Sequence, residues 1–544
     1  MPSEMKSRTY ILLLMALALA NVVAAFCFFR LDLTEDGRYS LSRSTKTMLS
    51  NLEEPLEVRL LLDGEMNASF LRLKNASSEL LQEMAVFADV RFTTEAPSAD
   101  EKGPISELQP TIIHEKQRGG QTVQTALFPY AYLRYKGRAT IVPLLRNNRG
   151  LSGEENINLS IEQLEFAFAE GISSLKREDV QKIAFLEGHD ELNELQTYDL
   201  CSELAKYFQV DRGSLTGRTE DLLPYKALVI ADPHKPFSDA EKYQIDQYLM
   251  HGGRLLIAVD GVRFSEDILS SDGFTPVIAQ DLNLQDMLFR WGVRVSPTLL
   301  QDRQCMPIPV DVSQDPQQPN FQPMPWYYAP LLLTSQVSPI SRNLMQVSST
   351  FCSGLELVGE DDGLEKNVLL ATSNASRAIV APAEVDLSLI ELDQAMFVHQ
   401  FIPVAASVEG CFNSLYAHRI APEGVSRTLP LKKQSEPTKM VVIASGSVMR
   451  AEVQQGQPLP LGYDRYTGMQ FANKDFIVNA LLYLTDDENL IGLRNKEVTL
   501  RLINEQRAIK LRTKVQILTI VLPLLLLALV GSIFLFIRKK RYAK

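Results

Sequence analysis

The sequence predicts an α/β protein whose folded region lies between two terminal transmembrane helices. Within that region, short apolar strands alternate with amphipathic helices, which is typical of a mostly parallel, doubly wound sheet. At the two ends, uncharged apolar runs cover residues 10–29 and 515–537. Each run reaches the roughly 20 residues that a helix needs to cross a bilayer core of about 30 Å. The length between the runs predicts two or three domains of roughly 100 to 200 residues each.

Changes of pattern along the chain set the expected domain boundaries. The alternation of apolar strands and amphipathic helices begins after a polar segment that follows the first run, and it ends before the second run. It is irregular in one stretch between them. We therefore expect juxtamembrane segments at 30–52 and 491–514, a small α/β domain at 53–150, a doubly wound domain at 151–490 with an insertion at about 297–437, and a basic tail at 538–544.

The first apolar run has a second interpretation as a cleaved signal peptide. Ala18 and Ala20 form an A-x-A cleavage pattern. The run continues to Phe29, however, and is longer than the roughly 7 to 15 apolar residues of a signal peptide. A membrane span is therefore the favoured interpretation.

Basic residues at the two ends predict the orientation in the membrane. The tail RKKRYAK follows the second run directly, and Lys6 and Arg8 precede the first, which places both termini in the cytoplasm. Lys510, Arg512 and Lys514 on the other side of the second run oppose this rule, but long domains cross membranes largely regardless of charge. We expect an inner-membrane protein with a large periplasmic domain.

Composition excludes several classes of protein. A net charge of -11 argues against a nucleic-acid partner, since such binding draws on neutralisation of phosphates. The five cysteines are scattered and form no C-x-x-C pair, so neither a zinc site nor a disulfide framework is indicated. A single disulfide stays open among the four cysteines outside the membrane, which are Cys201, Cys305, Cys352 and Cys411.

The small domain begins with a βαβ unit. A strand at LEVRLLLDG precedes a helix that Asn67 can cap, and DVRFTT returns as a strand. Three further strands are expected between residues 111 and 142. The arrangement resembles a thioredoxin-like domain without a C-x-x-C pair, so redox chemistry is unsupported.

In the larger domain, the apolar strands KIAFLEG, KALVIAD and RLLIAVD are each followed by a helix pattern. Ser238 and Glu241 form a capping box at the start of one helix, which Gly252 and Gly253 close. The stretch SQDPQQPNFQPMPW predicts a surface excursion within the insertion. The α/β rhythm resumes at KMVVIASGS and at the helix NKDFIVNALLYL.

Polar residues follow three of these strands, where ligands of doubly wound sheets bind. Two histidines with several carboxylates could bind a metal or share a proton. The favoured alternative is that they cap helices and form turns, because no H-x-x-x-H or H-x-H spacing is present and the metal signal is weak. The candidates are Glu187, Gly188 and His189 after the first strand, Asp232 and His234 after the second, and Asp260 after the third.

Signals for a nucleophile or a phosphate site are weak. Ser445 and Ser447 follow a strand, but the segment after them is a poor helix, unlike the turn that presents a catalytic serine. The string GSLTGRT from Gly213 lacks the lysine of a phosphate-binding loop. We therefore predict no catalytic residue, no metal, no cofactor and no hydrolysis of ATP by this chain alone.

Three motifs together resemble GldG-type proteins, which are auxiliary subunits of an ABC transporter associated with gliding motility in Bacteroidota. The motifs are RLDLTEDGRYSLS at 30–42, FLEGHDE at 185–191, and the block from GYDRYTGMQF to LRNKEV at 462–498. The resemblance covers nearly the whole chain in order. It implies a separate multi-span permease and a separate ATPase as partners, and an outer domain similar to class I glutamine amidotransferases without their catalytic cysteine.

The leading hypothesis is a non-catalytic periplasmic module that couples an ABC complex to a periplasmic or envelope partner. One alternative is a membrane-anchored hydrolase or amidotransferase relative that uses the strand-end residues; another is a passive scaffold of an envelope machine with an apolar outer patch. In the second span, Pro523 and Gly531 permit close approach of a partner helix within the lipid bilayer, the alternative being a simple anchor.

Overall fold

The computed structural model describes residues 15, 41–98, 101, 103–116, 122–145, 152–176, 180–313, 320–359, 363–386, 394–426, 428–486 and 505–542. The chain forms two units, one of Met1–Arg38 with Glu497–Lys544 and one of Tyr39–Lys496. The first predicted span at 10–29 lies outside the described residues except for Met15, and so do residues 31–40 and 487–504.

In the terminal unit, helix α11 (Glu505–Tyr542) contains the second predicted span. Its segment Thr519–Lys540 is 22 residues long, has a mean hydropathy of 3.0 and buries none of its apolar window. Length and composition therefore suit this helix for crossing a membrane. Pro523 lies inside the helix, and in the part of the chain that the structure describes no atom lies within 4 Å of a Cβ added at Gly531.

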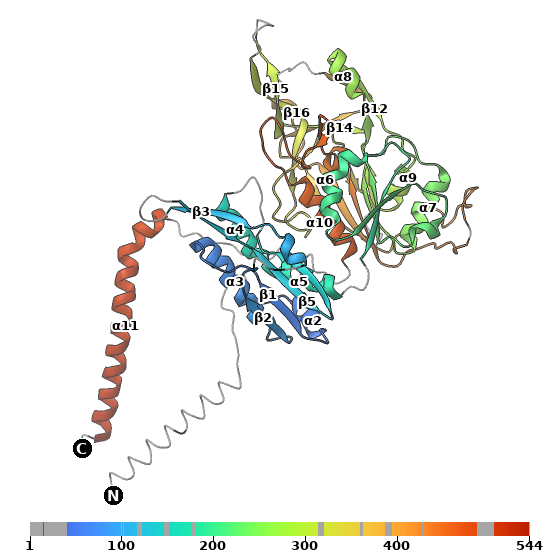
Figure 1. Ribbon diagram of the computed structural model, residues 1–544. Helices are drawn as coiled ribbons and strands as arrows, with labels where there is room; N and C mark the ends of the chain where they lie inside the picture. The colour runs from blue at the N-terminus through green and yellow to red at the C-terminus, as the bar shows by residue number, and fades with distance from the viewer. Residues whose placement is uncertain are drawn as a thin grey trace. The chain divides into compact units, whose positions relative to one another are not determined.

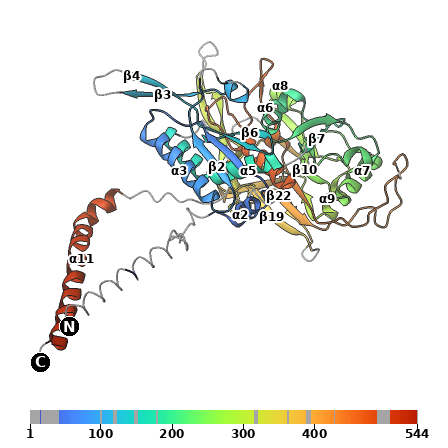
Figure 2. The same cartoon turned by 60° about the horizontal axis from the view of Figure 1, so that its bottom comes forward.

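The small domain carries a four-stranded sheet in the order β2-β1-β5-β6. Asn67 caps α3 as predicted, since its side chain accepts a hydrogen bond from the Phe70 N–H. The predicted strand QTALFPYAYLRY is divided at Phe128 and Pro129, and its first part pairs with β3 in a separate two-stranded ribbon (Figure 2). The elements are α2 (Arg43–Ser50), β1 (Leu56–Leu60), α3 (Ala68–Met84), β2 (Val90–Thr94), β3 (Thr111–Lys116), β4 (Thr122–Leu127), β5 (Tyr130–Tyr135), β6 (Arg138–Pro143), α4 (Gly153–Glu162) and α5 (Leu164–Lys176).

The larger domain is built on a ten-stranded sheet, whose first half is parallel (Figure 1). In the order β8-β7-β9-β10-β23, every pairing is parallel. The chain begins in β7, moves outward to β8, and then returns to the other side of β7, so the winding direction reverses between β7 and β9. The five strands are β7 (Lys182–Leu186), β8 (Gln209–Gly213), β9 (Ala227–Ala231), β10 (Arg254–Ala258) and β23 (Thr438–Ile443).

The other half of the sheet is antiparallel, so the prediction of a mostly parallel sheet is wrong beyond β23. In the described residues between Thr298 and Gly410, no α-helix separates consecutive strands, and strands joined without a helical crossover pair antiparallel. The predicted insertion at 297–437 thus supplies strands to the main sheet. These strands are β15 (Cys305–Asp311), β16 (Phe321–Thr334), β17 (Val347–Ser348), β19 (Glu365–Ala371) and β22 (Pro403–Gly410).

The predicted surface excursion SQDPQQPNFQPMPW is also partly wrong. Strand β16 begins at Phe321 and pairs with β15, whereas residues 314–319 lie outside the described residues. Smaller sheets surround this region; most of their strands share the core of Trp326, Val277 and Val385, whereas β13 and β18 add Val293 and Leu355 to the main core. Their elements are β11 (Val262–Arg263), α8 (Glu266–Asp272), β12 (Phe274–Ala279), β13 (Val293–Val295), β14 (Thr298–Asp302), β18 (Leu355–Leu357), β20 (Ser376–Val380) and β21 (Ala383–Asp386).

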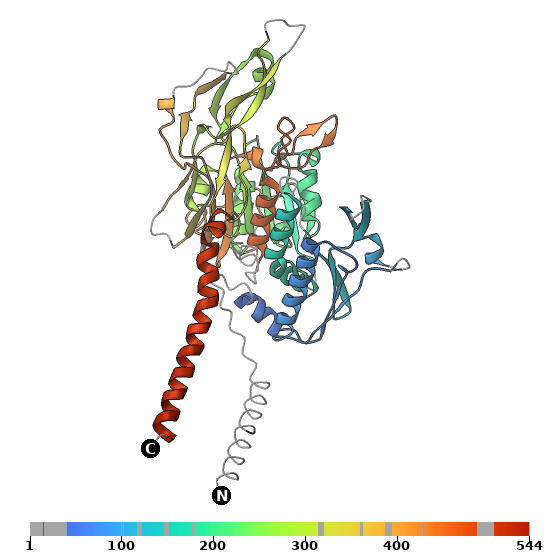
Figure 3. The ribbon, with the colours of Figure 1, turned by 90° about the vertical axis from the view of Figure 1, so that its left-hand side faces the viewer.

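Helices cover both faces of the parallel half. Helices α6 and α10 pack against each other on one face, and α7 and α9 lie on the other (Figures 1 and 3). All five residues of β9 are buried, as a strand covered on both faces requires. The helices are α6 (Glu194–Leu204), α7 (Asp239–Met250), α9 (Gln285–Arg290) and α10 (Asn473–Thr485).

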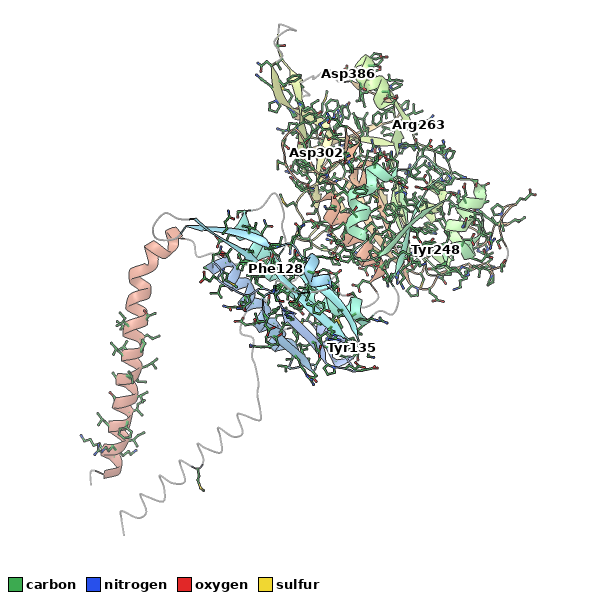
Figure 4. The ribbon with its side chains drawn as sticks, viewed as in Figure 1. Phe128, Tyr135, Tyr248, Arg263, Asp302 and Asp386 are labelled. Carbon is green, nitrogen blue, oxygen red and sulfur yellow. The ribbon has the colours of Figure 1, made fainter. Side chains whose placement is uncertain are left out.

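Helix α7 begins and ends at the residues that the sequence predicts. Ser238 and Glu241 form the full capping box. At the other end, a Cβ on Gly253 would come within 2.3 Å of the ring of Tyr248, which is labelled in Figure 4. Glycine is therefore needed where the chain leaves α7 and enters β10.

Candidate functional site

The predicted site residues lie at the carboxyl ends of β7, β9 and β10, beside the point where the winding direction reverses. The structure divides them into two groups and leaves Glu187 and Gly188 outside both. The first group is formed by Asp232 and Asp260, and the second surrounds His189. His234 joins the groups: its N–H donates to the His189 carbonyl at 2.7 Å, and its Nδ1 lies 3.9 Å from Asp232 Oδ1.

The carboxylate of Asp232 is fully buried directly after β9. Its Oδ2 accepts a hydrogen bond of 2.9 Å from Nη2 of Arg450, which follows β23. The Asp232 backbone has φ +58°, in the left-handed region that aspartate tolerates better than most residues. The ion pair thus connects the ends of two strands that are separated by β10.

Asp260 completes this first group from the end of β10. Its Oδ1 accepts a hydrogen bond of 3.0 Å from the Gly446 N–H. Burial raises the pKa of Asp260 well above its usual range, and the neighbouring Asp232 carboxylate raises it further. A Cβ added to Gly446 would stand 2.0 Å from Asp232 Oδ1, so only glycine fits against the pair.

The two candidate serines hold this turn in place. Ser445 is buried, and its hydroxyl lies 2.8 Å from that of Ser447. The Ser447 hydroxyl donates to the Thr350 carbonyl at 3.0 Å and accepts from the Thr350 N–H at 2.9 Å. Both hydroxyls are therefore engaged within the protein, which fits a structural role.

His189 is the centre of the second group. Its Nδ1 and Nε2 each lie 3.3 Å from a carboxylate, of Glu191 and Glu241 respectively, and its ring stacks on Phe237 at 3.8 Å. Burial disfavours the charged ring, but the hydrogen bond that the ring donates to Glu191 and the charge of Glu241 outweigh this effect and raise the pKa of His189. The capping glutamate of α7 thus also stabilises a protonated histidine.

Glu187 points away from both groups. Its Oε1 accepts a 2.6 Å hydrogen bond from Nε of Arg212, which also donates to Thr197 Oγ1 and to the Leu192 carbonyl. Gly188 has φ +126° and forms the turn after β7. These two residues shape the loop and take no part in the groups around Asp232 and His189.

Three residues of the site have no sequence signal that would place them beside their partners in it. Arg450 lies 218 positions from its partner Asp232, and Gly446 lies 186 positions from Asp260. Glu241 is recognisable only as a helix cap. The spacing of Glu191 two residues after His189 was the one available hint.

Metal and thiol chemistry find little support in the described part of the chain. No group of three or more His, Cys, Asp or Glu side chains there is placed to hold a metal ion. Cys201, Cys305, Cys352 and Cys411 are free thiols. Burial raises the pKa of Cys352 to about 12, which makes its thiol unreactive.

Comparisons with known proteins agree with a membrane-associated accessory protein. A family model described as an ABC-type uncharacterized transport system matches residues 180–480, and a domain of unknown function matches residues 35–134. An uncharacterized protein of Borreliella burgdorferi is 18% identical over 517 residues, covering 92% of this chain and 91% of its own.

Two solved structures are similar only weakly. The mmIFT52 N-terminal domain is 15% identical with a TM-score of 0.32, over 56% of this chain and 98% of its own. The exo-beta-1,4-mannosidase Op5Man5 from Opitutaceae bacterium strain TAV5 is 10% identical with a TM-score of 0.22, over 60% and 39%. Neither likeness carries an argument about this protein. The match over residues 180–480, more than half of the sequence, shows that the chain belongs to the auxiliary family of ABC-type transport systems.

Proposed function

We propose that this protein is a non-catalytic auxiliary component of an inner-membrane ABC transport complex, acting beside a separate multi-span permease and a separate ATPase. The observation that carries the proposal is the apolar helix Thr519–Lys540 in a chain of the transport family. One or two spans are too few to form a translocation path, so the transport role requires other membrane subunits.

The strand-end residues support the non-catalytic part of the proposal. Glu187 is held by Arg212, Asp232 by Arg450, and the hydroxyls of Ser445 and Ser447 by each other and by Thr350. A catalytic site aims its nucleophile and base at a shared position for the substrate. The carboxylates and hydroxyls named above instead form hydrogen bonds within the protein, and these bonds hold the loops together.

The proposal includes a placement in the cell envelope. Two spans with both termini in the cytoplasm would leave the folded region in the periplasm, where it couples the transporter to gliding motility or to another envelope function. The basic residues Arg538, Lys539 and Lys540 at the end of α11 support this orientation. The likenesses to amidotransferase and thioredoxin folds stay predictions.

Co-purification tests the proposed partnership. The tagged full-length protein is extracted in a mild detergent, and co-eluting proteins are identified by mass spectrometry. We expect one multi-span permease and one ATPase in stable proportion. A matched control carries an unrelated apolar span in place of residues 519–537 and should lose the permease. Elution of the intact protein without any transporter subunit would contradict the proposal.

A reporter fusion tests the placement separately. A reporter active only in the cytoplasm, fused after Lys544, should be active, and the same reporter inserted at an exposed loop of the folded region should be silent. An expressed but silent fusion at Lys544 would refute the cytoplasmic C-terminus without bearing on the partnership.

A further inference from the structure

We infer that the ends of β9, β10 and β23 form a binding site for one proton, which the carboxyls of Asp260 and Asp232 share. The inference concerns the fold of this domain and does not depend on the proposed transport role.

The first step is an unsatisfied acceptor at Asp232. Its side chain is fully buried, and Arg450 supplies a hydrogen bond to Oδ2 only. Among the described residues, Oδ1 has no hydrogen-bond donor; the nearest nitrogen, Nδ1 of His234, is 3.9 Å away and beyond hydrogen-bond distance. A buried acceptor without a donor costs about 1–3 kcal/mol, so this position calls for a donor.

The second step is the neighbouring Asp260, which can supply that donor. Its Oδ1 accepts the Gly446 N–H at 3.0 Å, and a Cβ on that same glycine would stand 2.0 Å from Asp232 Oδ1, so both carboxyls border one residue. Two ionised carboxylates cannot hydrogen-bond, because neither has a hydrogen to donate. A proton on Asp260 turns its second oxygen into an O–H donor to Asp232 and satisfies the buried acceptor.

The charges that face the pair require the same proton. Asp232 and His234 come from the end of β9, Arg450 from the segment after β23, and Cys352, whose thiol is neutral, from the segment before β18. Arg450 thus lies beside two carboxyls. Two neighbouring carboxyls in a site with little water repel each other when both are ionised, which raises the free energy of that state. A shared proton leaves one negative charge opposite Arg450.

The space beside the carboxyls of Asp232 and Asp260 is too small for a ligand larger than a proton. The backbone of Gly446 lies so close that even a methyl group there would stand 2.0 Å from Asp232 Oδ1. A metal ion or an ammonium group on this side would displace the turn formed by Ser445, Gly446 and Ser447. A proton fits without any rearrangement.

Replacement of Asp260 by Asn tests the site, because an amide imitates the protonated carboxyl. Its oxygen still accepts from Gly446, and its N–H₂ donates to Asp232. In the wild-type protein, the folded state holds a proton that the unfolded state releases near pH 4, so stability should fall as pH rises from about 4 through the raised pKa of the folded pair. We expect the unfolding midpoint of Asp260→Asn, measured on the full chain in detergent, to lose this component of the pH dependence.

Asp246→Asn is the matched control. Asp246 is fully buried and accepts hydrogen bonds from three donors: the Ser414 hydroxyl, the Gln247 amide and the Leu415 N–H. In Asp246→Asn, the side-chain N–H₂ would face one or more of these donors and could not accept their hydrogen bonds. The unfolding midpoint of this variant should therefore be lower at every pH. If Asp260→Asn also lowers the midpoint throughout and keeps the wild-type pH dependence, the inference is overturned.

Infrared spectroscopy gives a second readout that does not depend on the variant folding well. The wild-type protein at neutral pH should show the carbonyl band of a protonated carboxylic acid, and that band should disappear at alkaline pH. Asp260→Asn should lack it, and Asp246→Asn should keep it. Absence of the band from the wild-type protein would overturn the shared proton.

Discussion

Nη2 of Arg450 lies 2.9 Å from Oδ2 of Asp232, joining residues that are 218 positions apart in the chain. The Asp232 side chain has no exposed surface, whereas 28% of the Arg450 side chain is exposed. The contact holds the segment after β23 against the end of β9, across the intervening strand β10.

Removal of Arg450 should therefore destabilise the larger domain. Arg450→Ala leaves the Asp232 carboxylate buried without its counter-ion, and breaking a buried pair in this way costs about 3–5 kcal/mol; partial exposure of Arg450 places the value near 3. Denaturant unfolding measures the loss. The control Arg294→Ala breaks the exposed pair with Glu356 and should cost at most about 1 kcal/mol. Equal losses in the two variants would contradict the importance of the buried pair.

A methyl group at Gly446 should be poorly tolerated. A Cβ there would overlap the Asp232 side chain, with contacts of 2.0 Å to both Cγ and Oδ1. We expect Gly446→Ala to cost about 1–3 kcal/mol in unfolding free energy, since overpacking forces side chains to move. Gly153→Ala at the start of α4 meets nothing within 4 Å and should be neutral or slightly stabilising. A stable Gly446→Ala variant would show that the turn can move away.

His189 should make stability depend on pH. Its pKa is raised in the folded state, so the charged ring stabilises the fold below about pH 6.5, and this contribution is lost as pH rises through the folded value. The difference in unfolding midpoint between the wild-type protein and His189→Gln should shrink over that rise. Glu191→Gln removes one carboxylate and should reduce the effect; a difference independent of pH would argue that the ring is neutral throughout.

Replacement of the exposed His234 distinguishes the hypothesis of a catalytic site from that of a structural site. Half of its side chain, 53%, is exposed, and its N–H bond to the His189 carbonyl survives replacement by alanine. We expect His234→Ala to change stability by less than about 0.5 kcal/mol and to complement a strain that lacks the gene. A stable, assembled but inactive variant would indicate lost acid–base catalysis, which contributes about 10² to 10⁴ in rate, and would promote the enzyme hypothesis.

The second span should contact a partner helix through Gly531. Because no atom of the described residues lies within 4 Å of a Cβ at that position, leucine fits the isolated helix. In a helix pair, leucine would prevent the close approach that small residues allow. Gly531→Leu should therefore reduce co-purification of the permease, while the neighbouring Val530→Leu should not. Unchanged co-purification would leave α11 as a simple anchor.

The sequence was informative wherever the signal was local. The Asn67 cap, the capping box of Ser238 and Glu241, and the apolar strands β7, β9 and β10 are all confirmed, because each depends on residues within one or two turns of chain. The pairing of β22 with β23 was missed because the apolar pattern of a buried strand is the same in either direction. Arg450 was missed because a long-range partner leaves no trace in spacing.

The central position of β23 has a consequence for how the domain is made. In the finished sheet β23 lies between β10 and β22, yet Gly446 just beyond it is 186 positions from Asp260 just beyond β10. At about 5–20 residues per second, synthesis needs on the order of 10–40 s to pass from one strand to the other. During that interval β10 has β9 on one side and an unpaired apolar edge on the other, and such edges recruit other chains. The nascent domain must therefore be shielded from aggregation until its last sheet strand arrives.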